Sequence, residues 1–363
     1  KIVPIVPDEA RTFGMDGLFR QFGIYSREGQ KYIPEDADKV MWYRESEDGV
    51  MLEEGITEAG AFSAWLALAT SYANNQLPMI PFYIYYSMFG FQRIHDLAWA
   101  AGDARAKGFL LGATSGRTTL NGEGLQHQDG HSHLLAQTIP NCRSYDPCFD
   151  YELATIIEEG INDMYVENND NYYYLTVMNE NYIHPKRPKA ATNKAIMKGA
   201  YKFKNVKDPQ LRILASGLTL RLALSAADIL SKMNIKVEIW SITSFNELAR
   251  EGTATDQEKL YGSNKKESYV EECFGIPTPT IAVSDYQKLY TEQIRKWVKG
   301  DYVCLGTDGF GRSDTREKLR SFFEIDAKHI VFNALKVLKM DEQAKKFAKD
   351  NNIKFNSKHY LKR

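Results

Sequence analysis

The sequence has few cysteines, no excess of either charge and no long hydrophobic run. Its four cysteines form no C-x-x-C pair, which argues against a zinc ribbon and a disulfide scaffold and indicates a reducing compartment. We therefore expect a cytoplasmic protein. The 46 basic and 47 acidic residues give a net charge of −1, so no broad basic field is available for nucleic acid. No apolar stretch approaches the roughly 20 residues that span a bilayer, so we expect no membrane partner.

Two nucleotide-binding motifs are also missing. No G-x-G-x-x-G fingerprint occurs in the sequence, so direct NAD binding is not expected. Residues 306–313, G-T-D-G-F-G-R-S, are rich in glycine but lack the G-x-x-x-x-G-K-[ST] spacing of a phosphate loop. What remains is the composition of a folded protein, with 43% hydrophobic and 12% aromatic residues. The length of 363 residues predicts two domains.

Strand and helix patterns alternate along the chain. In the first half we expect strands at residues 78–86, 107–112 and 171–178, and helices at residues 56–72, 94–106 and 151–165. In the second half we expect strands at residues 211–216, 236–243, 280–283 and 302–306, and helices at residues 221–233 and 286–298. A polar segment with two prolines, at residues 184–193, places a domain boundary. The predicted domains are residues 1–187 and 196–363.

This alternation predicts an α/β fold made of two three-layer domains, each with a mostly parallel sheet covered by helices on both faces. Ligands of such sheets bind beyond the carboxyl ends of the strands. The charged residues 251–271 are expected to form a surface excursion, and the lysine-rich residues 340–363 a solvated tail. The chain begins with Lys1, directly on a strand-like run, so we expect a piece of a longer chain.

Residues 120–133, L-N-G-E-G-L-Q-H-Q-D-G-H-S-H, form the segment richest in potential chemistry. They hold His127, His131 and His133, three of the seven histidines in the chain. Histidine exchanges protons near neutral pH, and the glycines between the histidines allow close approach of a ligand to the backbone. We favour a role in acid–base chemistry and substrate binding. A histidine-ligated metal with Asp129 as a further ligand, and histidines that only cap turns, remain alternatives.

Glu58 begins an otherwise apolar helix, at the sequence T-E-A-G-A-F-S-A-W of residues 57–65. A carboxyl group in such surroundings is partly buried. Burial of this kind raises a carboxyl pKa, so that such a group can exchange a proton near neutral pH. The simpler interpretation is a carboxylate that interacts with the dipole at the start of the helix.

An aromatic run follows at residues 82–93, F-Y-I-Y-Y-S-M-F-G-F-Q-R. Most of its rings are expected in the core, but those beyond the strand end can stack on a planar ligand. Arg93 can pair with a carboxylate or a phosphate. The adjacent acids Asp8 and Glu9 follow the first expected strand and, taken alone, are typical of a solvent-facing loop.

Several segments together resemble a known family. They are residues 8–15 (D-E-A-R-T-F-G-M), 53–60 (E-E-G-I-T-E-A-G), 81–93 (P-F-Y-I-Y-Y-S-M-F-G-F-Q-R), 113–133 and 306–314 (G-T-D-G-F-G-R-S-D). These motifs resemble the homodimeric-type, thiamine-diphosphate-dependent component of pyruvate dehydrogenase, and more broadly the transketolase-type enzymes. The resemblance covers residues 1 to about 329.

The resemblance implies a role for each motif residue. Glu58 would hydrogen-bond the aminopyrimidine ring nitrogen of the cofactor and drive its activation. Ile56 would be the apolar wedge that holds the cofactor bent. The other residues are expected to line the site: Tyr86 and Phe89 beside the pyrimidine ring with Arg93 nearby, Glu123 and His127 at the reaction centre, and Asp8 and Glu9 on the channel that leads to it. No role is carried over to His131 or His133.

One family motif is missing from this chain. Such enzymes use a G-D-G segment and a later asparagine to bind magnesium and the diphosphate, and no G-D-G occurs here. The resemblance therefore implies a pyrimidine-binding domain and a carboxy-terminal domain, with the magnesium ligands in an amino-terminal domain outside the sequence. This chain itself is expected to supply no metal ligands. The isolated piece is expected to be inactive.

The resemblance also implies pyruvate as substrate, a homodimer, and the dihydrolipoyl acyltransferase component of the complex as partner. Two further readings stay open beside it. One is another transketolase-type thiamine enzyme with a different substrate. The other is a non-catalytic dimerisation or assembly module, in which Glu58 and His127 would be dispensable.

Overall fold

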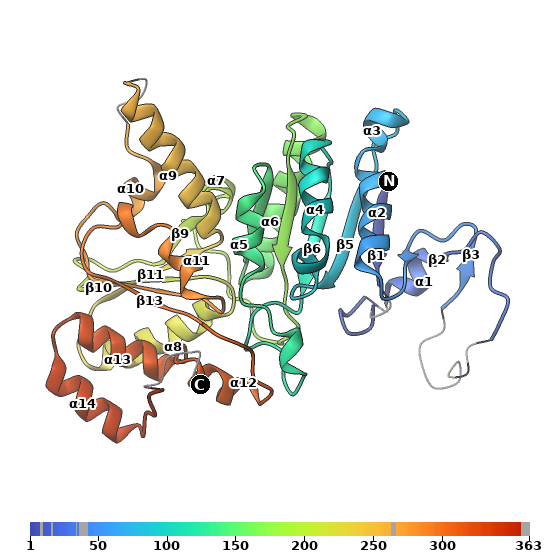
Figure 1. Cartoon of the computed structure of the whole chain (residues 1–363). Helices are drawn as coiled ribbons and strands as arrows, with labels where there is room; N and C mark the ends of the chain where they lie inside the picture. The colour runs from blue at the N-terminus through green and yellow to red at the C-terminus, as the bar shows by residue number, and fades with distance from the viewer. Residues whose placement is uncertain (8–9, 16, 34, 36–42, 263–265, 357–363) are drawn as a thin grey trace. The chain divides into compact units, whose positions relative to one another are not determined.

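The computed structural model describes residues 1–7, 10–15, 17–33, 35, 43–262 and 266–356 (Figure 1). The chain divides into two compact units. The first contains residues 1–115, 138–143 and 160–180, and the second contains residues 116–137, 144–159 and 181–363. Within the described residues, no helix is both long and apolar enough to cross a membrane.

The first unit is built on a parallel sheet, and its strand order is β4-β1-β5-β6-β8-β7. The strands are β1 (Ile2–Val6), β4 (Leu52–Glu53), β5 (Ile80–Tyr86), β6 (Phe109–Ala113), β7 (Cys142–Tyr145) and β8 (Tyr172–Thr176). Every described pairing among β4, β1, β5, β6 and β8 is parallel. A small parallel pair, β2 (Ile24–Tyr25) and β3 (Glu45–Ser46), stands apart from this sheet.

The helices of the first unit follow from its apolar runs. They are α1 (Leu18–Phe22), α2 (Glu58–Ala69), α3 (Ser71–Asn74) and α4 (Gly90–Asp103). α2 buries Phe62 and Trp65, and the indole of Trp65 donates a hydrogen bond to the backbone oxygen of Phe109 at 3.1 Å. α2 is thereby fixed against the sheet.

The second unit has its own sheet, with strand order β13-β12-β10-β11-β9. The strands are β9 (Ala200–Lys204), β10 (Leu211–Ala215), β11 (Val237–Ile242), β12 (Thr280–Val283) and β13 (Tyr302–Leu305). The pairings β10–β11, β10–β12 and β12–β13 are parallel, whereas β9 lies antiparallel to β11 at the edge. The antiparallel edge strand was not anticipated from the sequence.

Helices cover both faces of this second sheet, as the alternation predicts. Along β10, Ile213 contributes to a core with α8 (Thr219–Lys232) and α13 (Ala327–Val337), while Leu214 contributes to the opposite core with α9 (Phe245–Leu260). Figure 1 shows α8 and α13 on one side of these strands and α9 on the other. The remaining helices are α5 (Ser132–Thr138), α6 (Asp150–Ile161, followed by a π-helical turn, Asn162–Val166), α7 (Asn193–Met197), α10 (Tyr269–Phe274), α11 (Lys288–Glu292), α12 (Arg316–Phe322) and α14 (Asp341–Asp350).

The α/β class and the mostly parallel sheets are confirmed, but two local expectations are wrong. The described part of residues 251–271 has many exposed side chains but is largely helical rather than an irregular excursion: it contains the end of α9 and the start of α10, which begins with a capping box of Ser268 and Glu271. Among the charged residues of this stretch, Gly252, Thr255, Ser268 and Val270 are buried. Residues 286–298 form two short pieces, α11 and a 3₁₀ turn, Arg295–Trp297, rather than one helix.

The lysine-rich tail is also more ordered than expected. α14 buries Ala344 and packs Phe347 against the core that surrounds α13. Two apolar positions three residues apart lie on one face of a helix, and this short stripe was hidden among charged residues. The last described residues fold back as well, because the ring of Phe355 lies 4.5 Å from that of Phe332.

Candidate functional site

Glu58 lies where the sequence places it, at the first position of α2. Thr57 caps this helix by accepting the N–H of Gly60 at 3.3 Å, and the first turn of a helix favours a carboxylate. The Glu58 side chain is only 14% exposed, and its Oε1 accepts a hydrogen bond from Nη1 of Arg93 at 2.6 Å. A charge-assisted bond of this kind holds the carboxylate in one orientation.

Three aromatic rings lie next to this ion pair and contact one another in sequence. The guanidinium of Arg93 lies over the ring of Phe89, 4.3 Å from its centroid. Phe89 meets Tyr86 edge-on at 6.1 Å between centroids, and Tyr86 meets Phe13 at 5.1 Å. Tyr86 ends β5, so the cluster stands beyond the carboxyl end of a parallel strand, where ligands of such sheets bind. The first unit therefore brings four predicted site residues into one line of contacts.

The turn between β5 and α4 depends on a glycine. A Cβ on Gly90 would overlap the ring of Tyr85, so only glycine lets α4 begin there. α4 thus starts four residues earlier than expected, and its backbone departs from helical geometry at Ile94. Arg93 directly precedes that irregular residue. Ile56 is 69% exposed just before α2, while Asp8 and Glu9 lie outside the described residues.

The other predicted residues belong to the second unit. Glu123 is exposed on a loop, and His127 is half-buried at the end of a 3₁₀ turn, Leu125–His127. Gly122 has a φ of +76°, a conformation that glycine adopts at little cost.

Asp129 has a structural role next to these residues. Its Oδ1 accepts the N–H groups of His131 and Ser132, both at 2.9 Å, and so caps the start of α5. Within the described ranges, no group of three or more His, Cys, Asp or Glu side chains is arranged to hold a metal ion. The structure therefore gives no support to the histidine–metal alternative.

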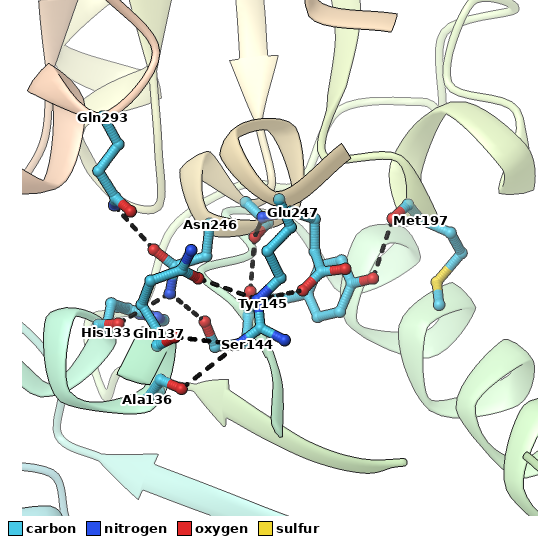
Figure 2. Close-up of polar contacts among 11 residues, drawn as sticks. His133, Ala136, Gln137, Ser144, Tyr145, Met197, Asn246, Glu247 and Gln293 are labelled. Carbon is cyan, nitrogen blue, oxygen red and sulfur yellow. Dashed lines mark hydrogen bonds and ion pairs between the residues drawn. The ribbon is translucent and has the colours of Figure 1, made fainter. Parts of the chain in front are cut away.

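His133 is a buried anchor rather than an exposed ligand. Its ring stacks on Tyr290 at 4.9 Å and meets Tyr286 edge-on at 4.8 Å. Burial lowers the pKa of His133 to about 4, although the charge of Asp129 opposes the shift. Figure 2 shows that Asn246 holds the same residue from α9: its amide nitrogen donates to the backbone oxygen of His133 at 2.7 Å.

Sequence reasoning missed two buried ionisable side chains in the second unit, Arg117 and Asp285. Arg117 is 4% exposed, with its guanidinium against the backbone of Gly130. Asp285 follows β12 and accepts the N–H of Thr118 at 3.0 Å. Burial raises the pKa of Asp285 to about 7, while the Thr118 N–H and the charge of Arg320 oppose this rise. The available signal was the polar segment S-D-Y directly after a strand.

The residues of the first unit fit one half of the implied cofactor. A carboxylate held beside aromatic rings suits a flat heterocycle that offers a ring nitrogen and an amino group. Among the residues that the structure describes, no group of three or more His, Cys, Asp or Glu side chains is arranged to hold the metal ion that accompanies a diphosphate. The residues around Glu58 therefore fit the pyrimidine ring of thiamine diphosphate.

Comparison with solved structures defines the class. The fold matches transketolase from Campylobacter jejuni with a TM-score of 0.68 and 17% identity, over 92% of this chain and 43% of that one. Transketolase from Leishmania mexicana matches equally well, with a TM-score of 0.68, 16% identity, and coverage of 93% and 43%. Identities this low establish the fold alone: the chain has the transketolase-type α/β fold.

Comparison with family models identifies the family within this fold. The model of the pyruvate dehydrogenase E1 component middle domain matches residues 1–185, and that of the transketolase-like C-terminal domain matches residues 199–326. The first match covers more than half of the chain. The chain therefore belongs to the pyruvate dehydrogenase E1 component middle domain family, which confirms the resemblance drawn from the motifs.

Individual proteins that are similar to this chain are named pyruvate dehydrogenase E1 component. A pyruvate dehydrogenase E1 component from Pseudomonas aeruginosa is 59% identical over 346 residues, which are 93% of this chain and 39% of that protein. The protein of that name from Escherichia coli K12 is 52% identical over 364 residues, or 98% of this chain and 41% of that protein. The chain thus spans about two fifths of the length of these relatives.

Proposed function

We propose that the protein carrying this chain is the decarboxylating subunit of a pyruvate dehydrogenase complex. It would decarboxylate pyruvate oxidatively with thiamine diphosphate and transfer the acetyl group reductively to a lipoyl group. The observation that carries this proposal is the family match over residues 1–185, because that segment contains Glu58 and its contacts. We further propose the domains 1–187 and 196–363, with the cofactor bound by the first.

The cofactor would supply the electron sink for loss of carbon dioxide, and the side chains of this chain would position it and move protons. Glu58, oriented by Arg93, would accept a hydrogen bond from the pyrimidine ring and hold the proton that activates it. Tyr86 and Phe89 would pack against the ring, and Ile56 would prop the bent cofactor.

The remaining site residues would act at the reacting carbon. His127 and Glu123 would line the reaction centre, with His127 as proton donor during acetyl transfer. Asp8 and Glu9 would lie along the entrance. Magnesium would be held by residues outside this chain. We propose a cytoplasmic homodimer whose partner is the dihydrolipoyl acyltransferase component.

The substrate class is tested by turnover of the complete, cofactor-loaded protein with pyruvate, longer 2-oxo acids and ketose phosphates. We expect pyruvate to be preferred by at least about 100-fold in kcat/KM over the ketose phosphates, a selectivity that corresponds to about 3 kcal/mol of transition-state binding. A preference for a sugar phosphate would favour the other transketolase-type reaction. Absence of all turnover, with normal folding, would favour an assembly module.

Replacement of His127 by alanine tests the acetyl-transfer role. We expect His127→Ala to lower acetyl transfer to a lipoyl domain by about 100-fold, the contribution typical of one acid–base group, with little change in melting temperature because the side chain is only half-buried. His95→Ala is the control, since that histidine hydrogen-bonds Thr138 elsewhere in the protein. Normal acetyl transfer in His127→Ala would show that the assigned role is wrong.

A further inference from the structure

The loop that carries Glu123 and His127 is fastened at both ends within the second unit. At its start, the N–H of Arg117 donates to the backbone oxygen of Asp285 at 3.2 Å, and the N–H of Thr118 donates to its carboxylate. At its end, Asn246 binds the backbone oxygen of His133 (Figure 2). Between these two anchors, the backbone is also held by the N–H of Gly122 on the oxygen of Asp314 at 3.2 Å and by the N–H of Gln287 on the oxygen of Gly130 at 2.8 Å.

Gln128 supplies the fixed point that lies directly after His127 in the sequence. Its side chain is fully buried, and its Oε1 accepts the N–H of Arg312 at 2.7 Å. Gln126, two residues earlier, has an exposed side chain. The loop therefore presents two glutamines of the same size on either side of His127, only one of which enters the protein.

Gly311 completes the contact from the other side. A Cβ added to Gly311 would stand 2.6 Å from the backbone oxygen of Leu125 and 2.7 Å from Oε1 of Gln128. Both distances are shorter than real Cβ contacts, so the absence of a side chain lets the two loops approach. The turn of residues 125–127 thus packs against Gly311, and the Gln128 side chain accepts its hydrogen bond from the next residue, Arg312.

A single 3₁₀ turn has little stability of its own. The turn is closed by the N–H of His127 on the oxygen of Gly124 at 3.0 Å and the N–H of Gln128 on that of Leu125 at 3.2 Å. Short 3₁₀ turns have poor hydrogen-bond geometry, so contacts outside the turn must select its conformation. The contacts with Gly311 and Arg312 are placed to do so.

We propose that Gln128 and Gly311 are positioning residues that fix the direction in which His127 leaves its loop. This inference rests on the proposed function, because it assigns His127 a reaction to be positioned for. Gln128 acts through the backbone next to His127 and Gly311 through the turn, so neither needs to touch a substrate. The second unit would then both contain the loop that carries His127 and hold it in place.

The test compares three variants in the complete, cofactor-loaded protein. Gln128→Met keeps the length of the side chain but removes the acceptor for Arg312. Gln128→Glu keeps an acceptor oxygen, since a buried carboxyl retains its proton. Gln126→Met is the matched control on the exposed side of the loop.

The first readout is structural and independent of activity. Hydrogen exchange of the peptide that contains Arg312 should accelerate in Gln128→Met, because its amide loses the acceptor, and should stay at the wild-type rate in Gln128→Glu and Gln126→Met. Melting temperatures show whether the whole fold has changed. Unchanged exchange in Gln128→Met would overturn the proposal, because the bond it rests on would then be absent in solution.

The second readout separates positioning from general damage. Acetyl transfer to a lipoyl domain should fall by about 100-fold in Gln128→Met, the loss expected for a misplacement of about 1 Å. Pyruvate decarboxylation with an artificial oxidant should stay within about threefold of wild type, and the KM for pyruvate within about twofold. Gln128→Glu should restore most of the acetyl transfer. Gly311→Ala, whose added methyl group displaces the turn, should reproduce the defect of Gln128→Met.

Each contrary outcome has a separate meaning. Faster exchange with normal acetyl transfer in Gln128→Met would overturn the positioning role while leaving the contact real. An equal loss in both half-reactions would also overturn it, since a specific effect on His127 is required. If the wild-type protein does not decarboxylate pyruvate, the proposed function itself is wrong, and the positioning role is overturned with it. The exchange data then still decide whether the contact exists.

Discussion

Glu58→Ala in the complete, cofactor-loaded protein is expected to lower pyruvate turnover by at least about 100-fold, the scale of one general acid–base group. The carboxylate is 14% exposed and bonded to Arg93 at the start of α2, so its loss removes the acceptor proposed to activate the cofactor. The cofactor's spectroscopic signature of activation should disappear together with turnover.

The fold should tolerate this change. Arg93, the ion-pair partner, is 49% exposed, and ion pairs of this accessibility contribute at most about 1 kcal/mol. The cap from Thr57 is untouched by the substitution. Asp103→Ala is the control, because it removes an exposed carboxylate from the end of α4 in the same unit. Unchanged turnover in Glu58→Ala would remove the basis of the proposed chemistry.

Arg212→Met is expected to cause the largest loss of stability in the second unit. Arg212 on β10 and Glu238 on β11 are paired residues of neighbouring strands, and their side chains are 3% and 4% exposed. Nε of Arg212 donates to Glu238 at 2.8 Å. Removing one partner of a buried pair costs about 3–5 kcal/mol, because the other charge stays buried. The melting transition of this unit should fall by about 10 °C.

The matched control removes the second cation of the same cluster. Lys202 contacts Glu238 at 3.0 Å but is 34% exposed, so Lys202→Met should cost at most about 1 kcal/mol. Replacing both members of the buried pair, as in Arg212→Met with Glu238→Leu, should recover part of the loss. Equal destabilisation in Lys202→Met and Arg212→Met would contradict the burial argument.

The same cluster predicts that the stability of the second unit depends on pH. Burial alone would raise the pKa of Glu238, but hydrogen bonds from Arg212, Trp240 and Lys202 outweigh it and hold the pKa below its usual value. Because the folded pKa is lowered, the contribution of Glu238 is present above its unfolded pKa of about 4.3. It is lost as the pH falls through the folded value. In Arg212→Met, the melting temperature should therefore fall less between pH 6 and pH 3 than it does in the wild-type protein. Thermal melts across this pH range measure the difference.

The fold was predicted well where a sequence pattern is compatible with only one kind of structure. Alternating strands and helices imply parallel sheets, and α2 begins at Glu58, as expected, with Thr57 as its cap. The predictions were wrong where charged residues outnumber the apolar positions of a short helix, as in α10 and α14. The edge strand β9 was missed because its orientation depends on its pairing with β11 and not on its own residues.

The candidate site was predicted in part. Motifs identified Glu58, Tyr86, Phe89 and Arg93, and the structure places these four in contact, although their roles remain proposals. Gln128 could not be singled out, because its importance arises from a neighbour 184 positions away in the sequence. A single chain gives no signal for a contact that distant.

The buried imidazole of His133 has a consequence for experiments in solution. It is neutral at physiological pH, and Asn246 and Gln293, which continue its network, are uncharged amides joined by a 2.8 Å hydrogen bond. Mobile ions do not screen contacts between neutral groups. Varying the ionic strength should therefore leave this end of the loop intact, so a salt dependence of the proposed acetyl transfer would have to arise from charged groups elsewhere.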